Sequence, residues 1–167
     1  MVLPEQAVIL LVEDRTDDVL LIQRALARAG VKNPFFVLRD GEEALAYLHG
    51  TGKYADRDEY PLPDIMLLDL KMPKMDGFEV LQHVRQHKNF RALRIIVLTS
   101  SEDIFDVNKA YELGANSFLV KPLEFENLSA MMRTLSSFWL HQSRAPVLER
   151  PHRKKNGSGQ HAEGADR

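Results

Sequence analysis

The 167-residue sequence contains no cysteine and has a formal net charge of only −2. Without cysteine there can be no disulfide, no thiolate nucleophile and no Cys-ligated zinc site. A nearly balanced charge gives no overall attraction to nucleic acid or to an anionic membrane, so any electrostatic function must be local. No apolar run approaches the ~20 residues that span a bilayer, and no basic segment precedes the first apolar run as in a secretory signal. We therefore expect a cytoplasmic protein with no nucleic-acid or membrane partner.

The length and the 44% hydrophobic content suit one domain of ordinary size with appendages. Apolar periodicity stops after Leu140, and the remaining residues are rich in proline, glycine and charge. The expected organisation is an N-terminal extension (1–6), a globular domain (7–142) and a disordered polar tail (143–167). The basic stretch Arg150–Lys155 in that tail reads as a solubilising feature or as a contact for an acidic partner.

Short, unbroken apolar runs recur along the chain at 8–12, 35–37, 65–68, 95–98 and 118–120. Continuous hydrophobicity is typical of parallel strands that are covered on both faces. The segments between them have helical spacing, and parallel strands need crossover helices. The pattern predicts an α/β fold, a (βα)5 doubly wound five-stranded parallel sheet.

Helix faces and helix starts can also be predicted. The first helix should carry Val19, Ile22, Leu26 and Ala29 on one face and stop at Gly30. The last helix should carry Leu128, Met131, Leu135 and Phe138 on one face. Capping-box pairs are expected at Asp76 with Glu79 and at Ser100 with Asp103.

Polar residues follow four of the five predicted strands: Glu13-Asp14, Asp69, Thr99-Ser100 and Lys121-Pro122. In an open α/β sheet these strand ends meet in one crevice at the topological switch point. Clustered carboxylates raise one another's pKa, and a hard divalent cation such as Mg²⁺ relieves that cost. Asp69 can then act as a phosphoryl acceptor, with Lys121 and the Thr99 hydroxyl as ligands for the phosphoryl oxygens.

Each of these residues alone has a simpler interpretation. A single Asp after a strand is more often a turn residue or a helix cap. Taken together, however, the residues favour a functional site, because each of the four strand ends carries a group that the same reaction needs.

The ordered motifs "ILLVED", "MLLDLKMPKMDG", "IIVLTSS" and "FLVKP" resemble the receiver domains of two-component response regulators over about residues 7–140. That family has the flavodoxin-like (CheY-like) fold with strand order 2-1-3-4-5. Within it, the chain looks most like the small stand-alone regulators paired with bacterial phytochromes.

The resemblance implies a role for each matching residue. Asp69 would be the phosphoacceptor, Mg²⁺ would be held by Glu13, Asp14, Asp69 and the Lys71 backbone carbonyl, and Thr99 and Lys121 would bind the phosphoryl group. A cis peptide bond between Lys121 and Pro122 would aim the lysine inward, which is plausible because an X-Pro bond needs only about 0.5–1 kcal/mol for it. Phe118 is either the aromatic that turns inward when Thr99 moves, or a core residue. Lys71 and Arg15 depart from the Asn common at their positions, which leaves the lifetime of the phosphorylated state open.

The resemblance also implies partners. The phosphoryl donor would be a sensor histidine kinase, phytochrome-like in this subfamily, or a histidine phosphotransfer protein, and the output would be a changed surface. The protein would not be an enzyme beyond its own phosphorylation and dephosphorylation. Trp139, next to Phe138, either anchors a homodimer or kinase contact or packs on the domain's own core.

Two other functions remain as alternatives. One is an interaction module that binds without phosphorylation, which the complete acidic and Lys/Thr set disfavours. The other is a phosphate-ester hydrolase, disfavoured because Lys71 stands where such an enzyme carries a second acid. His83 and His87 have metal-ligand spacing, but no third ligand is evident and solvated helix residues are the simpler interpretation.

Overall fold

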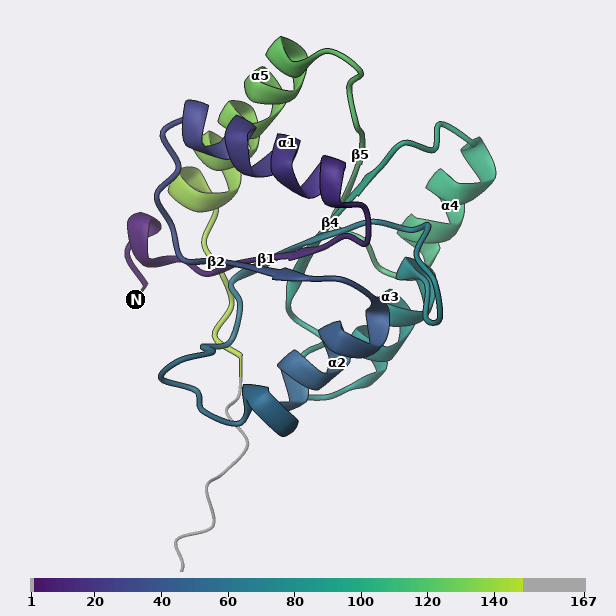
Figure 1. Cartoon of the computed structure of the whole chain (residues 1–167). Helices are drawn as coiled ribbons and strands as arrows, with labels where there is room; N and C mark the ends of the chain where they lie inside the picture. Colours follow the sequence, from purple (N-terminus) through teal and green to yellow (C-terminus); the bar gives the residue numbers. More distant parts are fainter. Residues whose placement is uncertain (1, 149–167) are drawn as a thin grey trace, which may run out of the picture.

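The computed structural model describes residues 2–148 and contains one parallel sheet of five strands (Figure 1). The strands are β1 (Ile9–Val12), β2 (Phe35–Leu38), β3 (Ile65–Leu68), β4 (Arg94–Thr99) and β5 (Ser117–Val120). Their order in the sheet is β2-β1-β3-β4-β5, and all neighbours are parallel. This confirms the predicted doubly wound fold and places the switch point between β1 and β3.

Helices cover both faces of the sheet (Figure 1). They are α1 (Thr16–Arg28), α2 (Gly41–His49), α3 (Gly77–Gln86), α4 (Ile104–Glu112) and α5 (Phe125–Leu135). Helices α1 and α5 pack together on one face, and α2, α3 and α4 lie on the other. Short 3-10 turns η1 (Pro4–Gln6) and η2 (Gly52–Tyr54) and a π-helical segment η3 (Ser136–Gln142) complete the described chain. None of the helices in residues 2–148 has the length and apolar character needed to cross a bilayer.

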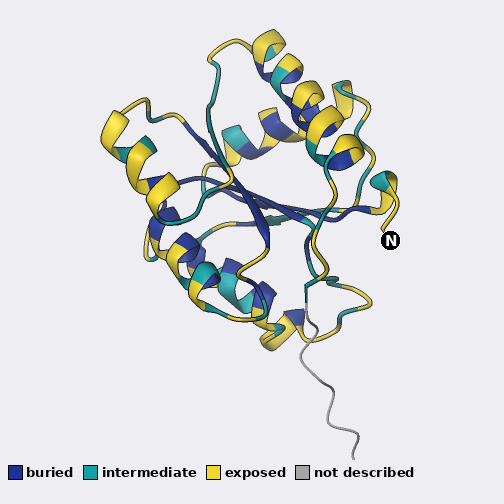
Figure 2. Ribbon diagram, turned by 180° about the vertical axis from the view of Figure 1, so that it is seen from behind, coloured by how far each residue is buried: buried dark blue, intermediate teal, exposed yellow. Residues whose placement is uncertain are grey.

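The core is divided by the sheet into two layers. Along β1, Ile9 and Leu11 face α1 and α5, whereas Leu10 and Val12 face α2 and α3. All residues of the central strands are buried, while the edge strands are partly exposed, as the dark sheet between yellow helix surfaces in Figure 2 shows. Burial on both faces explains why the central strands have no alternating polar residues.

Most of the predicted helix signals are confirmed. Helix α1 buries Val19, Ile22 and Leu26 and ends before Gly30, which has a positive φ of 79°. Helix α3 begins with the expected capping box, in which the Asp76 side chain accepts from the Glu79 backbone N–H and Glu79 accepts from that of Asp76.

Two of the helix predictions are wrong. Helix α4 is capped by Asp103, whose carboxylate accepts from the Phe105 N–H at 2.9 Å, and not by Ser100, which still belongs to the turn after β4. Phe138 is 49% exposed, although the helical spacing predicts that it shares the apolar face of the last helix with Leu128 and Leu135, which are buried. The helix widens to a π-helix at Ser136, and this change of period turns Leu140 inward in its place.

Both ends of the predicted domain have contacts with its body. The Asn33 amide donates to the backbone carbonyls of Pro4 and Ala7, at 2.6 and 2.9 Å, and so fastens the N-terminal extension. At the other end, Leu148 packs against the core layer between the sheet and helices α2 and α3. Core contacts therefore extend beyond the expected boundary at residue 142. The rest of the predicted tail (149–167), with its basic stretch, lies outside the described residues.

Candidate functional site

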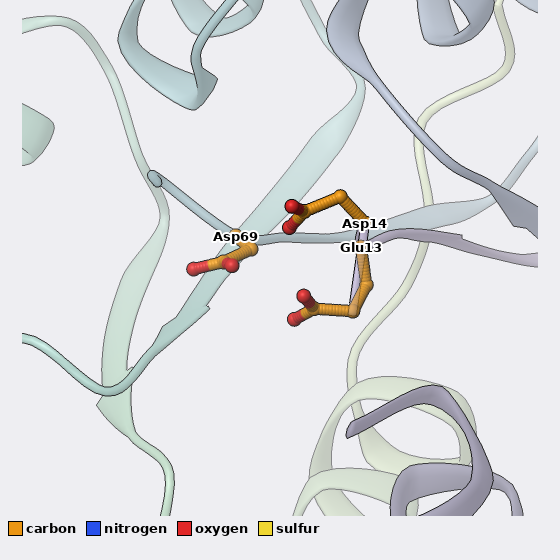
Figure 3. A group of neighbouring side chains, drawn as sticks. All are labelled: Glu13, Asp14 and Asp69. Carbon is orange, nitrogen blue, oxygen red and sulfur yellow. The ribbon is translucent and has the colours of Figure 1, made fainter. Parts of the chain in front are cut away.

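Three carboxylates converge at the switch point of the sheet (Figure 3). Glu13 and Asp14 directly follow β1, and Asp69 directly follows the neighbouring strand β3. One oxygen from each carboxylate lies within 4.8 Å of the other two. Glu13 is fully buried and Asp69 is 4% exposed. The structure thus brings together the three acids that the sequence places at separate strand ends.

The position of Asp69 is fixed by its own loop. Its backbone N–H donates to the Val12 carbonyl at 3.1 Å, and its Oδ1 accepts from the Leu70 N–H at 2.8 Å. The first residue of α3, Gly77, packs directly against this backbone, and a Cβ there would lie only 2.2 Å from the Asp69 carbonyl oxygen. Glycine at 77 is therefore required for α3 to start this close to the acid.

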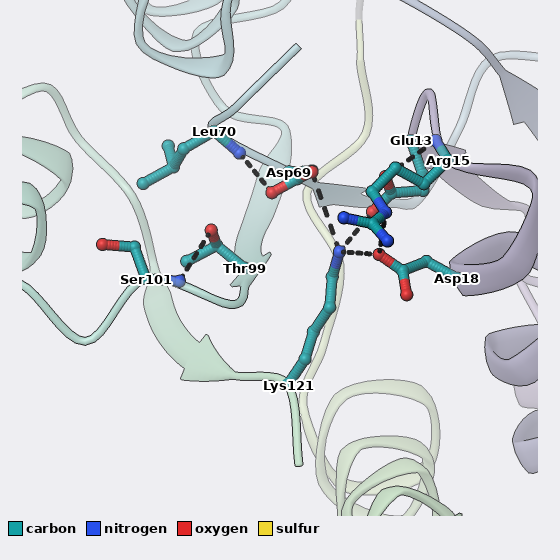
Figure 4. Close-up of polar contacts among 8 residues, drawn as sticks. All are labelled: Glu13, Arg15, Asp18, Asp69, Leu70, Thr99, Ser101 and Lys121. Atoms are coloured by element: carbon teal, nitrogen blue, oxygen red, sulfur yellow. Dashed lines mark hydrogen bonds and ion pairs between the residues drawn. The ribbon is translucent and has the colours of Figure 1, made fainter. Parts of the chain in front are cut away.

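Lys121 extends from the end of β5 into the acidic cluster (Figure 4). Its ammonium donates to Glu13 and, at 3.0 Å, to Oδ2 of Asp18, and it lies 3.7 Å from Oδ2 of Asp69. Its side chain is only 10% exposed. One buried cation is thus shared among three carboxylates.

The peptide bond between Lys121 and Pro122 is trans, since no cis bond occurs in residues 2–148, and the predicted cis bond is wrong. Trans is the lower-energy isomer of an X-Pro bond. The long lysine side chain reaches the acids from this backbone, so a cis bond is not needed to aim it.

The electrostatics of the cluster reflect its burial. Desolvation raises the pKa of Glu13 to about 7, and the Asp69 charge adds to this rise, while the Lys121 ammonium opposes it. Burial alone would lower the pKa of Lys121, but the Glu13 hydrogen bond and the Asp69 charge outweigh burial and raise it. Lys121 therefore neutralises the carboxylates of the cluster only in part.

The donor set fits a hard divalent cation. All three acids offer oxygen, the ligand that Mg²⁺, Mn²⁺ and Ca²⁺ prefer. The Oδ1 atom of Asp14 is buried without a hydrogen-bond partner among the described residues. A buried carboxylate oxygen without a partner is costly, and a cation ligated there would remove that cost.

Of the two predicted switch residues, Thr99 lies beside the cluster (Figure 4). Thr99, at the end of β4, is fully buried, and its Oγ1 accepts from the Ser101 N–H at 3.3 Å. Phe118 in β5 is half-buried and packs on the small core cluster next to α4, and its backbone N–H donates to the Tyr111 hydroxyl. In this structure Phe118 is thus partly turned into the core.

The Lys71 side chain pairs with an acid of α4. Its ammonium lies 3.3 Å from Oδ2 of Asp106 in α4, and the same oxygen accepts from the Ser101 hydroxyl at 2.6 Å. These contacts connect the loop after β3 with the loop after β4. Arg15 lies in ion-pair range of Asp18, at 3.6 Å.

Trp139 is half-buried against its own domain. Arg94 donates to the Trp139 carbonyl at 2.7 Å, and its guanidinium lies 5.7 Å from the ring centroid. The ring packs beside the core layer of α1 and α5. Of the two adjacent aromatics, Phe138 is the exposed one. In this structure Trp139 packs on the core of its own domain.

Two residues in the site were not predicted from the sequence. Asp18 binds Lys121, and Asp106 binds Lys71 and Ser101. Asp18 lies in the first turn of α1, directly after the strand end that carries the acid pair, and that position is the signal that could have found it. Asp106 carries no comparable signal, because its partners come from two other loops.

Comparison with known proteins gives consistent results. The family model described as "Response regulator receiver domain" matches residues 9–133. The "Probable methanogenesis regulatory protein FilR2" of Methanothrix harundinacea is 40% identical over 142 residues, which cover 83% of this chain and 87% of that protein. "Response regulator Rcp1" of Synechocystis is 38% identical over 140 residues, 84% of this chain and 93% of that one.

Solved structures agree with these matches. The phosphorylated cyanobacterial phytochrome response regulator RcpA superposes with a TM-score of 0.79 at 35% identity, covering 85% of this chain and 99% of that one. The Mn²⁺-bound form of Rcp1 superposes with a TM-score of 0.76 at 38% identity, covering 84% and 99%. Both similarities extend over nearly the whole of the described chain.

Proposed function

The chain belongs to the response regulator receiver family of two-component signalling, and from this premise we propose that it accepts a phosphoryl group on Asp69. The observation that carries the proposal is the buried acidic cluster with Lys121 at its centre. A structural role would not need like charges to be stacked in a buried position, because this arrangement is unfavourable. A site that handles phosphate and a cation does need it.

The transfer itself would be a displacement at phosphorus. An Asp69 carboxylate oxygen attacks the phosphorus of a phosphohistidine, the new P–O bond forms, and the P–N bond breaks. The electron pair of that bond returns to the imidazole of the donor, which takes up a proton. Such a reaction depends on positioning and charge neutralisation more than on acid or base catalysis. The Leu70 N–H, which holds Asp69 Oδ1, supplies part of that positioning.

The proposed cofactor is Mg²⁺, held by the carboxylates of Glu13, Asp14 and Asp69 and by the backbone carbonyl of Lys71. The unpartnered Asp14 oxygen and the all-oxygen donor set support it. The similarity to the Mn²⁺-bound form of Rcp1 supports a divalent ion as the cofactor. When bound, the ion neutralises charge on the acids and on the incoming phosphoryl oxygens.

Lys121 and Thr99 would bind the remaining phosphoryl oxygens. Lys121 already lies 3.7 Å from Asp69, and it would exchange part of its contact with Glu13 and Asp18 for the phosphoryl group. The Thr99 hydroxyl now serves as an acceptor for Ser101, and its movement toward the phosphoryl group would release that loop. Phe118 would then complete its turn into the core, so that phosphorylation biases a two-state equilibrium.

The proposed donor is a sensor histidine kinase or a histidine phosphotransfer protein. The likeness to a regulator described as that of a cyanobacterial phytochrome supports a kinase of the phytochrome type. The output would be a partner protein, or a second copy of this chain, that distinguishes the two surface states.

The test uses acetyl phosphate and Mg²⁺ with intact-mass measurement. We expect the full chain to gain one phosphoryl group and Asp69→Asn to gain none. Asp17→Asn is the matched control, because Asp17 is an exposed acid in the first turn of α1. No gain by the wild-type chain, or equal gain by Asp69→Asn, would reject Asp69 as the acceptor and favour binding without phosphorylation.

A further inference from the structure

Three histidines gather at the C-terminal ends of α2 and α3, outside the acidic cluster. His49 is the last residue of α2, His83 lies in the last turn of α3, and His87 is the C-cap residue that directly follows α3. The two helices run side by side beneath the sheet (Figure 1). The sequence shows only the spacing of His83 and His87, whereas the fold adds His49 from another helix.

The two nearest histidines are placed as a pair of metal ligands would be. The Nε2 atoms of His49 and His83 are 3.0 Å apart, and the rings meet at 79°. In a neutral imidazole one nitrogen donates and the other accepts, so two neutral rings at this distance share a single proton. Two imidazole nitrogens on one ion, with bonds of about 2.0–2.1 Å, are separated by about 3.3 Å in a tetrahedral site and about 2.9 Å at a right angle. The observed separation lies between these values.

His87 forms one wall of the same cluster. Its ring centroid is 5.0 Å from that of His49 and 6.2 Å from that of His83, and it stacks on Phe90 at 4.5 Å. Its Nδ1 accepts from the Asn89 N–H at 3.3 Å, a long and therefore weak bond. Rotation of this ring would release Asn89 and supply a third ligand.

The surroundings favour a cation. Both helices end here, and the C-terminal end of a helix carries partial negative charge. The positively charged Arg57 lies next to Gly50, the residue after His49, and opposes this effect. The positive charge of Arg57 is occupied in capping α2, because its guanidinium donates to the Tyr47 and Leu48 carbonyls at 2.8 and 2.6 Å.

We propose that Nε2 of His49 and Nε2 of His83 bind a divalent transition-metal ion of the Zn²⁺, Ni²⁺ or Cu²⁺ class, with His87 available as a third ligand. Imidazole ligands select these ions over Mg²⁺ and Ca²⁺, which take oxygen. The chain would then hold two kinds of cation at separate sites. A metal there would replace the shared proton and join the ends of α2 and α3.

The test is a titration of the full chain with zinc chloride in the presence of excess Mg²⁺, which occupies the acidic cluster. Calorimetry gives stoichiometry and affinity, and ¹H–¹⁵N spectra of the histidine rings identify the ligands. We expect one equivalent of Zn²⁺ to shift the His49 and His83 ring signals, and the melting temperature to rise with Zn²⁺ because the ion binds only the folded chain.

Matched variants separate this site from other histidines. His49→Gln/His83→Gln should weaken Zn²⁺ binding by more than about tenfold and abolish the rise in melting temperature. His152→Gln/His161→Gln, which changes two histidines outside the described residues, should leave both unchanged. Each single variant, His49→Gln and His83→Gln, should also weaken binding, which covers the case of a misfolded double variant.

Three outcomes would overturn the proposal. They are no Zn²⁺ binding by the wild-type chain, unchanged affinity in His49→Gln/His83→Gln, and loss of binding in Asp69→Asn but not in the histidine variants. The last result would assign the ion to the acidic cluster.

Discussion

The ammonium of Lys121 lies 3.7 Å from Oδ2 of Asp69, although the two residues come from strands that β4 separates. The same ammonium binds Glu13 and Asp18. Lys121 is therefore the cation that makes the acidic cluster tolerable without a metal. Its removal should affect stability and signalling in different ways.

For stability, we expect Lys121→Met to lower the free energy of unfolding in EDTA by about 3 kcal/mol, because it leaves a buried carboxylate without its partner. Mg²⁺ should restore part of the loss, since it also compensates the acids. Urea unfolding with EDTA and with Mg²⁺ measures both values. Lys109→Met, which removes a lysine of α4, is the control, and equal destabilisation in EDTA and in Mg²⁺ would contradict the shared role.

For signalling, Lys121→Ala should still take a phosphoryl group on Asp69 but fail to switch, because the link between the phosphoryl group and β5 is lost. Intact mass measures the first property, and binding of the phosphorylated form to a partner that recognises it measures the second. A normal phosphorylation-dependent change in affinity would refute the coupling role.

Lys71 is bound to Asp106 at 3.3 Å, and its side chain is largely exposed. We expect Lys71→Ala to leave the hydrolysis rate of the Asp69 phosphate nearly unchanged and to lower stability by less than about 1 kcal/mol, as for other exposed ion pairs. Lys74→Ala, which loses a similar pair with Asp40, is the control. A large change of hydrolysis rate in Lys71→Ala alone would mean that the ammonium moves to the phosphoryl group.

Gly77 touches the backbone of Asp69. We expect Gly77→Ala to lower stability by about 2–3 kcal/mol through overpacking and to slow phosphorylation, because relief of the clash moves the acceptor. Gly30→Ala is a useful comparison, since its positive φ is strained but nothing lies within 4 Å of the added Cβ. That variant should lose about 1 kcal/mol and phosphorylate normally. Equal phosphorylation rates in both variants would argue against the positioning role of Gly77.

Trp139 and Phe138 should have different roles. Trp139→Ala should lower stability by about 2 kcal/mol, less than for a fully buried tryptophan, because the ring is half-buried under Arg94. Phe138→Ala should change stability little and should be the variant that weakens any self-association. Urea unfolding and analytical ultracentrifugation measure these effects, and the reverse assignment would show that Trp139 is the interface residue.

Glu43 links α2 to the turn η2. Burial alone would raise its pKa, but the Tyr54 hydroxyl and the Arg39 N–H, with Lys53 nearby, hold it below its ordinary value of 4.5. Because the folded pKa is depressed, these bonds stabilise the fold above pH 4.5, and the contribution is lost as the pH falls through the folded value.

Tyr54→Phe should therefore lower stability by about 2 kcal/mol at pH 7, as expected for a hydrogen bond to a charged group. The difference from wild type should shrink as the pH falls below 4.5 and through the lowered pKa of Glu43 in the folded state, because the carboxylate then becomes protonated. Urea unfolding at several pH values tests this, and a difference that does not change with pH would exclude the carboxylate as the source.

Much of the fold follows from local patterns. The apolar runs that became β1, β3 and β4 are continuous because both faces of these strands are covered, and this property is visible in the sequence. The capping box of α3 is equally local. The spacing fails at Phe138 because the α-helical period does not continue through the segment from Ser136, where the helix changes to the wider π form with i→i+5 hydrogen bonds.

The sequence by itself determined which chemical groups stand at the ends of the strands. Parallel strands all end at the same edge of a sheet, and so Glu13, Asp14, Asp69, Thr99 and Lys121 could be assigned to that edge, while the strand order came from the resemblance to receiver domains. Only the tertiary structure decided how the charges are shared. Contacts such as Lys121 with Asp18, Lys71 with Asp106, and His49 with His83 join separate elements. They depend on side-chain direction and on the distance between packed helices, which no local pattern encodes.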